Sequence, residues 1–459
     1  MQALKTAFFR TIIAILLLVP MGAAAQRLAS SVSTYSPYSM YGLGELSTKG
    51  NVIQRSMGGV GVAMWTNNMV NVLNPAAYAL TPQQSFLFNF GVEGGHFRNA
   101  QDKFEASTTS TVRTAYNTIN IHDIAFQMPL AKNFGMGFSL TPYSNVGYNM
   151  YRDDLSQDVI GNIGRVNYQY QGDGDVTEVK AGLGWKPFRS VAIGVAAMYY
   201  WGNIKRSYDT VVTNITGDGS YSSTMGVDTY DVSRFKMQAG IMWNPIYQDQ
   251  RILTIGATYD LGGAVNPDMV KHVYVDNILT SVVRLEEDSA LPLRLPQQVT
   301  AGVFYQTLKV RFGADYVYQD WGSQNTNFAE SGGTGVHVAY TDTHTVKVGL
   351  EVVPRYSDVA HYFNRVAYRI GARMGDYYQT FGGGNVRQYA VTAGLGLPIR
   401  LFGRSSINIG FEAGMRCPDS ETIMINNKLA GTIRQTYYKF SLGLNLFGED
   451  RWFVRQKFN

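Results

Sequence analysis

Basic residues in the C-terminal half of the chain are the best candidates for binding an anion. Arg365, Arg369 and Arg373 recur at every fourth residue, so on a β-strand their side chains would share one face. Charge-assisted hydrogen bonds from such groups to a carboxylate are strongest in a partly dry pocket. The candidate contacts for a carboxylate ligand, all expected to face inward, are Lys347, Arg365, Arg369, Arg373 and Arg311.

A second interpretation of the same cations stays open. Inward-facing carboxylates such as Glu93, Glu178 and Glu412 could neutralise them, as happens in the polar interior of many membrane barrels. For any single cation we favour this pairing over a ligand contact.

The chain offers no pattern typical of an enzyme. The six histidines are scattered, and His122 and Asp123 are adjacent, so on a regular strand they would face opposite sides. The single cysteine, Cys417, allows neither an internal disulfide nor a cysteine-based metal site. The glycine-rich stretches "GLGE" and "GGVG" follow no strand, which argues against nucleotide binding. We predict a protein that is not an enzyme and needs no metal or cofactor.

The elements that would position these residues are β-strands with one apolar face. "VAIGVAAMYYW" (Val191–Trp201) and "YYKFSLGLNLF" (Tyr437–Phe447) alternate apolar with small or polar residues. Only 16% of residues are charged, while glycine (48), tyrosine (30) and phenylalanine (23) are abundant, and mean hydropathy is -0.12. One-sided apolar strands rich in glycine and aromatics are typical of a transmembrane β-barrel rather than a soluble sandwich.

Link lengths predict the size of this barrel. Short links near 130–134, 187–190 and 245–250 alternate with long polar links such as 96–118, 144–175 and 207–233. Short turns belong to the periplasmic side and long loops to the outside. The sequence therefore predicts an all-β fold, a transmembrane antiparallel β-barrel of about 14 strands with an N-terminal luminal plug.

The N-terminus predicts export. Lys5 and Arg10 precede an apolar stretch at 11–19, and the small residues Ala23 to Ala25 complete a signal peptide cleaved after Ala25. Loss of these two charges reduces the formal net charge from +5 to about +3, too little to indicate nucleic-acid binding. We expect the mature protein in the outer membrane of a Gram-negative cell.

Residues 26–84 lack strand alternation but carry many large apolar residues, which predicts burial inside the barrel. Asn74 is a good helix N-cap and Pro75 suits the first helical position, so a short helix should begin there. The predicted divisions are a signal peptide (1–25), a plug (26–84), the barrel (85–447) and a periplasmic tail (448–459).

The stretch Arg55–Leu80, "RSMGGVGVAMWTNNMVNVLNPAAYAL", resembles the N-terminal hatch of FadL-type long-chain fatty-acid transporters. The matching residues are Gly58, Gly59, Gly61, Asn74, Pro75 and Ala76. The resemblance implies a fourteen-stranded barrel with a plug, and passive uptake of small hydrophobic molecules or lipids by plug movement.

Pro142 lies inside the third predicted strand, followed by Asn145 and Gly147. Proline cannot donate to a β-ladder and belongs at edges or bulges, so pairing with one neighbour should break there. The resemblance implies that Pro142, Asn145 and Gly147 mark a lateral gate. The alternative is that Pro142 lies at the outer rim, where strands end.

Relatives with the same hatch pattern do other work, which leaves a second function open. The barrel would then be a scaffold or shuttle subunit of an outer-membrane secretion or assembly complex. Its partners would be proteins, and its long outer loops would be the contact surface.

Overall fold

The computed structural model describes residues 34–448 except 35, 84, 106–107, 155–156, 215–220, 249, 266–267, 286–292, 325–335, 359, 400–404 and 426–427. The predicted signal peptide lies outside the described residues, and so does the predicted C-terminal tail (448–459) apart from Gly448, the last residue of β23.

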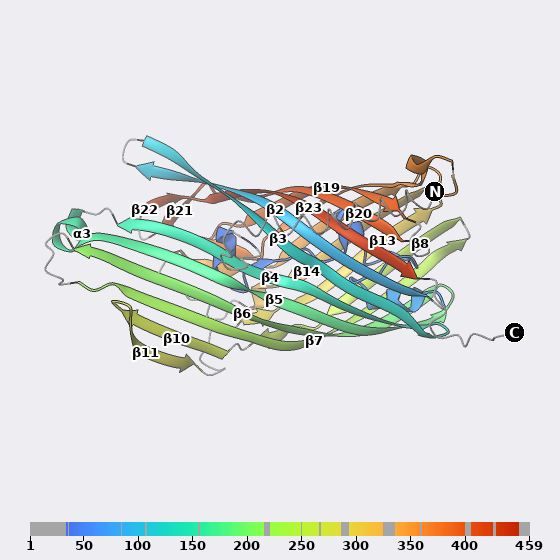
Figure 1. Cartoon of the computed structure of the whole chain (residues 1–459), viewed down its shortest axis with the longest axis horizontal. Helices are drawn as coiled ribbons and strands as arrows, with labels where there is room; N and C mark the ends of the chain where they lie inside the picture. Colours follow the sequence, from blue (N-terminus) through green and yellow to red (C-terminus); the bar gives the residue numbers. More distant parts are fainter. Residues whose placement is uncertain are drawn as a thin grey trace, which may run out of the picture.

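Fourteen long antiparallel strands form a closed barrel, because the first of them, β2, pairs with the last, β23 (Figure 1). This confirms the predicted strand number. The strands are β2 (Phe86–Glu105), β3 (Thr108–Ala131), β4 (Phe134–Asp154), β5 (Gly164–Phe188), β6 (Val191–Asn214), β7 (Thr224–Gln248), β8 (Arg251–Asp260), β13 (Gln297–Thr307), β14 (Val310–Asp320), β16 (Thr343–Val352), β17 (Ala367–Asp376), β19 (Val386–Pro398), β20 (Ser406–Pro418) and β23 (Ile433–Gly448).

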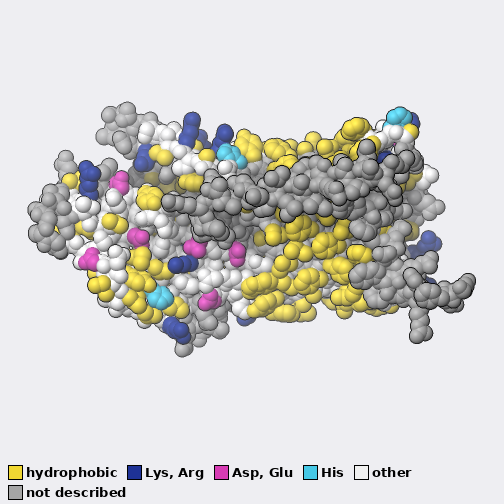
Figure 2. Space-filling view, in the orientation of Figure 1, with side chains coloured by type: hydrophobic (Ala, Val, Ile, Leu, Met, Phe, Trp, Pro, Cys, Tyr) yellow, Lys and Arg dark blue, Asp and Glu magenta, His cyan; other side chains and the backbone are white. Residues whose placement is uncertain are grey.

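The strands keep the predicted alternation between two faces. On β6, Val195 is 55% exposed while its neighbour Ala196 is buried, and on β7 Trp243 is exposed beside buried Met242. The outward residues form an apolar band on the barrel surface, visible in yellow in Figure 2. An outward apolar band around a closed barrel is the pattern of a membrane-spanning barrel. Among the described helices none has the length and apolar character to cross a membrane.

The strands run much further than their hydropathy pattern predicts. The link expected at 96–118 is mostly strand, because β2 continues to Glu105 and β3 begins at Thr108. The links expected at 144–175 and 207–233 are shortened in the same way. The physical reason is that a ladder of backbone hydrogen bonds can continue beyond the membrane, where both faces are polar and alternation disappears.

Short elements occupy the outer end of the barrel, at the left in Figure 1. They are α3 (Gln157–Asn162), β9 (Gly263–Val265), β10 (Asp268–Val275), β11 (Ile278–Leu285), β12 (Leu293–Leu295), η3 (Gly322–Gln324), β15 (Val338–Tyr340), β18 (Gln379–Phe381), β21 (Thr422–Ile425) and β22 (Lys428–Gly431). At the opposite end, η4 (Tyr362–Arg365) lies in the turn between β16 and β17.

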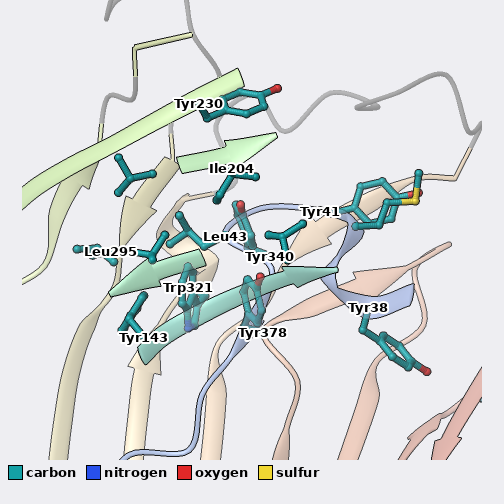
Figure 3. Close-up of a cluster of buried hydrophobic side chains, with 14 of the residues drawn as sticks. Tyr38, Tyr41, Leu43, Tyr143, Ile204, Tyr230, Leu295, Trp321, Tyr340 and Tyr378 are labelled. Carbon is teal, nitrogen blue, oxygen red and sulfur yellow. The ribbon is translucent and has the colours of Figure 1, made fainter. Parts of the chain in front are cut away.

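Residues 34–83 lie inside the barrel, where Figure 1 shows them in dark blue. They contain η1 (Pro37–Met40), β1 (Glu45–Leu46), α2 (Val52–Arg55) and η2 (Pro75–Leu80). Their outer part packs into a large aromatic cluster (Figure 3). This cluster contains Tyr38, Tyr41 and Leu43, together with Tyr143 and Tyr230 of the wall and Tyr378 of the link after β17. We call residues 34–83 the luminal segment.

Candidate functional site

The glycines of the predicted plug motif let the luminal segment approach the wall closely. Gly58 has φ of +72°, and a Cβ added there would lie 2.6 Å from the carbonyl oxygens of Val348 and Ala372. At Gly61 the contact with the wall is polar: the amides of Gly61 and Val62 donate hydrogen bonds to the Asp315 carboxylate at 2.7 and 3.0 Å. Only glycine tolerates both the left-handed backbone and this spacing at position 58.

Asn74 fixes the last turn of the luminal segment. Its side chain accepts a hydrogen bond from the Ala76 amide at 3.0 Å and donates to the carbonyls of Val62 (2.8 Å) and Ile241 (3.2 Å). The predicted helix start at Pro75 is confirmed, and the helix is a short 3₁₀ helix. Asn74 therefore joins three chain segments, two luminal and one in the wall.

Arg55 connects α2 to the wall through buried ion pairs. Its guanidinium contacts the Glu93 carboxylate and lies 3.9 Å from that of Glu412. Glu412 also pairs with Arg373 at 2.5 Å, and Glu93 pairs with Lys439 at 3.2 Å. Buried charges of this kind hold their partners firmly, because removing one partner leaves the other unpaired away from water.

Most of the predicted ligand cations pair with carboxylates of the barrel. Glu351 binds Arg311 at 2.8 Å and Arg369 at 2.6 Å, and Arg373 pairs with Glu412. These contacts match the pairing interpretation. The prediction that Arg365 shares the wall of Arg369 and Arg373 is wrong. Arg365 belongs to η4, ahead of β17, where its guanidinium lies over the ring of Tyr362.

Lys347 is the predicted contact that stays available. No salt bridge of Lys347 is present within the described residues, and its side chain lines an inner cavity of about 180 Å³. Other cations of this cavity are engaged, since Lys49 pairs with Glu178 at 2.8 Å and Lys180 donates to the Val72 carbonyl at 2.8 Å. The cavity is polar and lies beside the middle of the luminal segment.

A larger and more apolar pocket of about 530 Å³ lies at the outer end. Its floor comes from η1 and the following turn, with Tyr38, Met40 and Tyr41. Val112 and Tyr116 of β3 line one side, and β4 lines the other with residues that include Tyr148 and Met150. No sequence pattern indicated this pocket, because its lining comes from segments up to several hundred residues apart.

The backbone pairing between β3 and β4 stops before the outer end of the barrel. These strands pair from Ala131–Phe134 up to Ile124–Leu140, and β3 continues beyond that point paired only with β2. The free edge of β4 is instead occupied by the luminal segment. Glu45 and Leu46 of β1 pair with Asn145 and Ser144. We call this unpaired stretch the β3–β4 seam.

The three predicted gate residues all lie on the β4 side of this seam. Pairing of β4 with β5 shifts register between Pro142 and Ser144. Asn145 donates to the Ser47 hydroxyl at 3.0 Å, and the Gly147 carbonyl accepts from the Ser36 amide at 2.8 Å. Pro142 therefore coincides with an irregularity in the strand at the level where the luminal segment replaces β3.

His122 and Asp123 contradict the expectation drawn from their adjacency. His122 Nδ1 and an Asp123 carboxylate oxygen are 2.8 Å apart, and both side chains are buried. A register shift between Gly91 and Val92 on β2 makes His122 an extra residue of β3, so neighbouring side chains point the same way. His122 lines a small cavity beside Pro142 and Asn145, where its Nε2 is 3.3 Å from the Thr48 carbonyl oxygen.

The turn between β16 and β17 contains a tight acidic cap. The Asp358 carboxylate accepts hydrogen bonds from the Asn364 side chain and from the amides of His361 and Ala360. These bonds, led by that of Asn364, hold the pKa of Asp358 well below its usual range.

Among the described residues, no group of three His, Cys, Asp or Glu side chains could hold a metal ion.

A model of one protein family matches almost the whole chain. The family is described as BamG, and the match covers residues 8–459. The chain belongs to the BamG family. No curated protein matches this member of the family.

Solved structures show that this BamG family member has the FadL-type barrel fold. A FadL homologue from Pseudomonas aeruginosa aligns at a TM-score of 0.60 with 13% identity, over 88% of this chain and 99% of the homologue. The Pseudomonas putida toluene transporter TodX aligns at 0.53 with 12% identity, over 90% and 99%. The Ralstonia pickettii toluene transporter TbuX aligns at 0.51 with 12% identity, over 87% and 98%. The chain is an outer-membrane β-barrel, and two of these neighbours, TodX and TbuX, are described as toluene transporters.

Proposed function

We propose that this protein is an outer-membrane channel for the passive uptake of small hydrophobic, fatty-acid-like molecules. The apolar pocket at the outer end carries the proposal, because Met40, Tyr148 and Met150 line a space large enough for a hydrocarbon. Moving apolar surface from water into such a pocket is favourable by about 25 cal/mol for each Å² buried. The toluene transporters that share the fold support this choice of ligand class.

The proposed exit is sideways through the β3–β4 seam into the membrane, with Pro142, Asn145 and Gly147 as the lateral gate. The pocket is lined by β3 and β4, the two strands that part at the seam. A ligand leaving there avoids the polar inner cavity. In this route β1 is the obstruction, since it pairs with β4 where β3 does not.

The proposed plug movement involves the outer part of the luminal segment. Residues 36–47 contain β1 and are bound to β4 by the short β1 pairing and by hydrogen bonds at Gly147 and Tyr143. Glu45 of β1 also forms a buried ion pair with Arg416 of β20 at 2.6 Å, which a displacement must break. The part from α2 to η2 is also held by buried contacts, those of Arg55, Asp315 and Asn74, but it contains no strand paired with β4. Ligand opens the seam only if it binds the displaced arrangement more tightly. For a ligand with a carboxylate, Lys347 is the proposed inner contact.

A disulfide between β1 and β4 tests the proposal. Leu46 and Ser144 are directly paired, so Leu46→Cys with Ser144→Cys places two thiols within bonding geometry. The pair is built in a Cys417→Ser background, because Cys417 is the only native cysteine. We expect oxidation to lower uptake of a hydrophobic substrate roughly tenfold, and reduction to restore it.

The matched control places a disulfide in the opposite wall. Ala257 and Ala301 are directly paired between β8 and β13, so Ala257→Cys with Ala301→Cys crosslinks strands without touching the luminal segment. Uptake in this control should not depend on oxidation. Equal uptake by the locked and unlocked β1 variants would remove lateral exit and plug movement from the proposal.

A second function, as a scaffold in an outer-membrane protein complex, is favoured by two observations. The chain belongs to the BamG family, and this membership is compatible with a subunit of an outer-membrane complex. In addition, the β10–β11 hairpin exposes Ile278, Leu279 and Val282 beyond the apolar band, where lipid does not cover them. Exposed aliphatic side chains on an edge strand are typical of a protein contact.

Purification in mild detergent separates the two functions. A scaffold should be isolated with protein partners in fixed stoichiometry, and Ile278→Asp with Val282→Asp should release them. A channel should be isolated without such partners and with apolar ligand in the outer pocket. Stoichiometric partners without any ligand would reject the channel.

A further inference from the structure

Three arginines gather on the outward face of the barrel, at the outer limit of the apolar band. Outward residues of β2, from the turn end to the outer end, are Phe88, Phe90, Val92, Gly94, His96, Arg98 and Ala100. Ala100 is paired with Arg113 of β3 on one side and with Arg434 of β23 on the other. Directly paired residues share a face, so Arg98, Arg113 and Arg434 all point outward around Ala100.

Register alone places these side chains within reach of one anion. Neighbouring strands are about 4.8 Å apart, so the backbones of Arg113 and Arg434 are separated by about 10 Å across Ala100. Arg98 is two residues from Ala100 along β2, at about 7 Å. The small methyl group of Ala100 leaves the space between the three guanidinium groups open. All three side chains are exposed.

Nearby groups neutralise this cluster only in part. Asp102 accepts a hydrogen bond from Arg434 at 3.0 Å, and Thr111 also donates to this carboxylate. Arg98 donates through Nε to His96 Nε2 at 3.1 Å, which leaves its two terminal nitrogens for a ligand. Arg113 forms no ion pair within the described residues. The face therefore keeps about two positive charges beyond those balanced by Asp102.

Apolar residues lie directly below the arginines. Ile119 and Phe440 flank Gly94 on the two neighbouring strands, with exposed fractions of 70% and 54%. Tyr438 flanks His96, at the level where aromatic side chains mark the membrane interface. Figure 2 shows Lys and Arg side chains gathered along the upper edge, where the yellow band ends. Within a few residues along these strands, the outward surface of the barrel changes from apolar, where lipid acyl chains can pack, to positively charged.

We propose that Arg98, Arg113 and Arg434 bind the phosphate-bearing headgroup of a lipid in the outer leaflet, with its acyl chains against Ile119 and Phe440. Arginine is suited to phosphate because its planar fork donates two parallel hydrogen bonds to the oxygens. A lipid matches this face better than free phosphate, because only an amphiphile contacts the cationic and apolar rows together. This site lies on the outside of the barrel and does not depend on the proposed channel.

Lipid binding to the purified full chain in detergent tests the proposal, with native mass spectrometry as the readout. The probes are a phosphorylated lipid A and the same lipid without phosphates. We expect R98Q/R113Q/R434Q to bind phosphorylated lipid A roughly tenfold or more weakly than the unmodified protein. The control R165Q/K205Q/R387Q removes the same charge from exposed positions elsewhere and should bind as the unmodified protein does.

Several results would overturn the site. One is that the two triple variants bind phosphorylated lipid A equally. Another is that the unmodified protein binds the dephosphorylated lipid as tightly as the phosphorylated one. A third is that millimolar inorganic phosphate displaces bound lipid to the same extent from both triple variants. Since the three side chains point away from the core, the cluster variant should keep the thermal unfolding midpoint of the control. If it did not, R113Q alone, which breaks no ion pair, should still lower binding severalfold, and unchanged binding would reject the site.

Discussion

Glu351 is a residue whose loss should destabilise the barrel wall. Its carboxylate is buried and binds the guanidiniums of both Arg311 and Arg369. Glu351→Gln would leave the buried charge of Arg369 without a counter-charge, at a cost of roughly 3–5 kcal/mol. We expect a lower unfolding midpoint in denaturant. Asp419→Asn, which breaks the exposed pair with Arg387, should cost about 0–1 kcal/mol, and an equal loss in both would contradict the argument.

Gly58 and Gly383 separate backbone strain from close packing. Both have positive φ, +72° and +82°, but a Cβ at Gly383 meets nothing within 4 Å whereas one at Gly58 meets two carbonyl oxygens. Gly383→Ala should cost about 1 kcal/mol from strain alone. Gly58→Ala should cost clearly more, measured by the same unfolding assay. Similar losses would mean that the luminal segment shifts easily to accept a methyl group.

The turn capped by Asp358 should respond to pH in one direction. Because hydrogen bonds lower the pKa of Asp358, the folded turn is stabilised at pH above the ordinary carboxyl value. This stabilisation is lost as pH falls below that value toward the folded pKa. Proteolysis of residues 353–366 should therefore accelerate in acid, and Asp358→Asn should be fast at every pH. Acid-independent cleavage of the unmodified turn would contradict this.

At the level of elements, the number of strands and the residues that face outward could be predicted from the sequence. The ends of the strands and the β3–β4 seam could not. Apolar and polar residues alternate along a strand where one of its faces contacts lipid, so this pattern identified Val191–Trp201. It did not identify the polar extensions of β2 and β3 beyond the membrane. Pro142 indicated a break in pairing, yet nothing local showed that β1 would take the place of β3. The bulge that turns His122 inward was equally hidden, because it depends on the register between two strands.

Backbone exchange should reveal the seam directly. Between 111 and 121, β3 is paired with β2 alone, so its amides that point away from β2 lack a strand partner. We expect alternate amides of this stretch to exchange hydrogen much faster than those of β20, which is paired on both sides. Exchange is measured on the protein in detergent. Uniform protection along β3 would mean that another chain segment or molecule covers its edge.

At the scale of the whole molecule, a barrel of this size needs an occupied interior to stay impermeable. The luminal segment lies in this interior, and Arg55 binds it to Glu93 and Glu412 on the wall. Arg55→Met keeps much of the apolar stem but leaves the two carboxylates to repel each other, which should weaken the hold of α2. In planar bilayers we expect the unmodified protein to be closed and Arg55→Met to show intermittent ion conductance. Arg311→Gln breaks a wall-to-wall pair instead and should stay closed. If Arg55→Met conducted no more ions than the control, the Arg55 ion pair would not be what keeps the barrel closed. The aromatic outer cluster and the polar contacts of Asp315 and Asn74 would then hold the luminal segment in place.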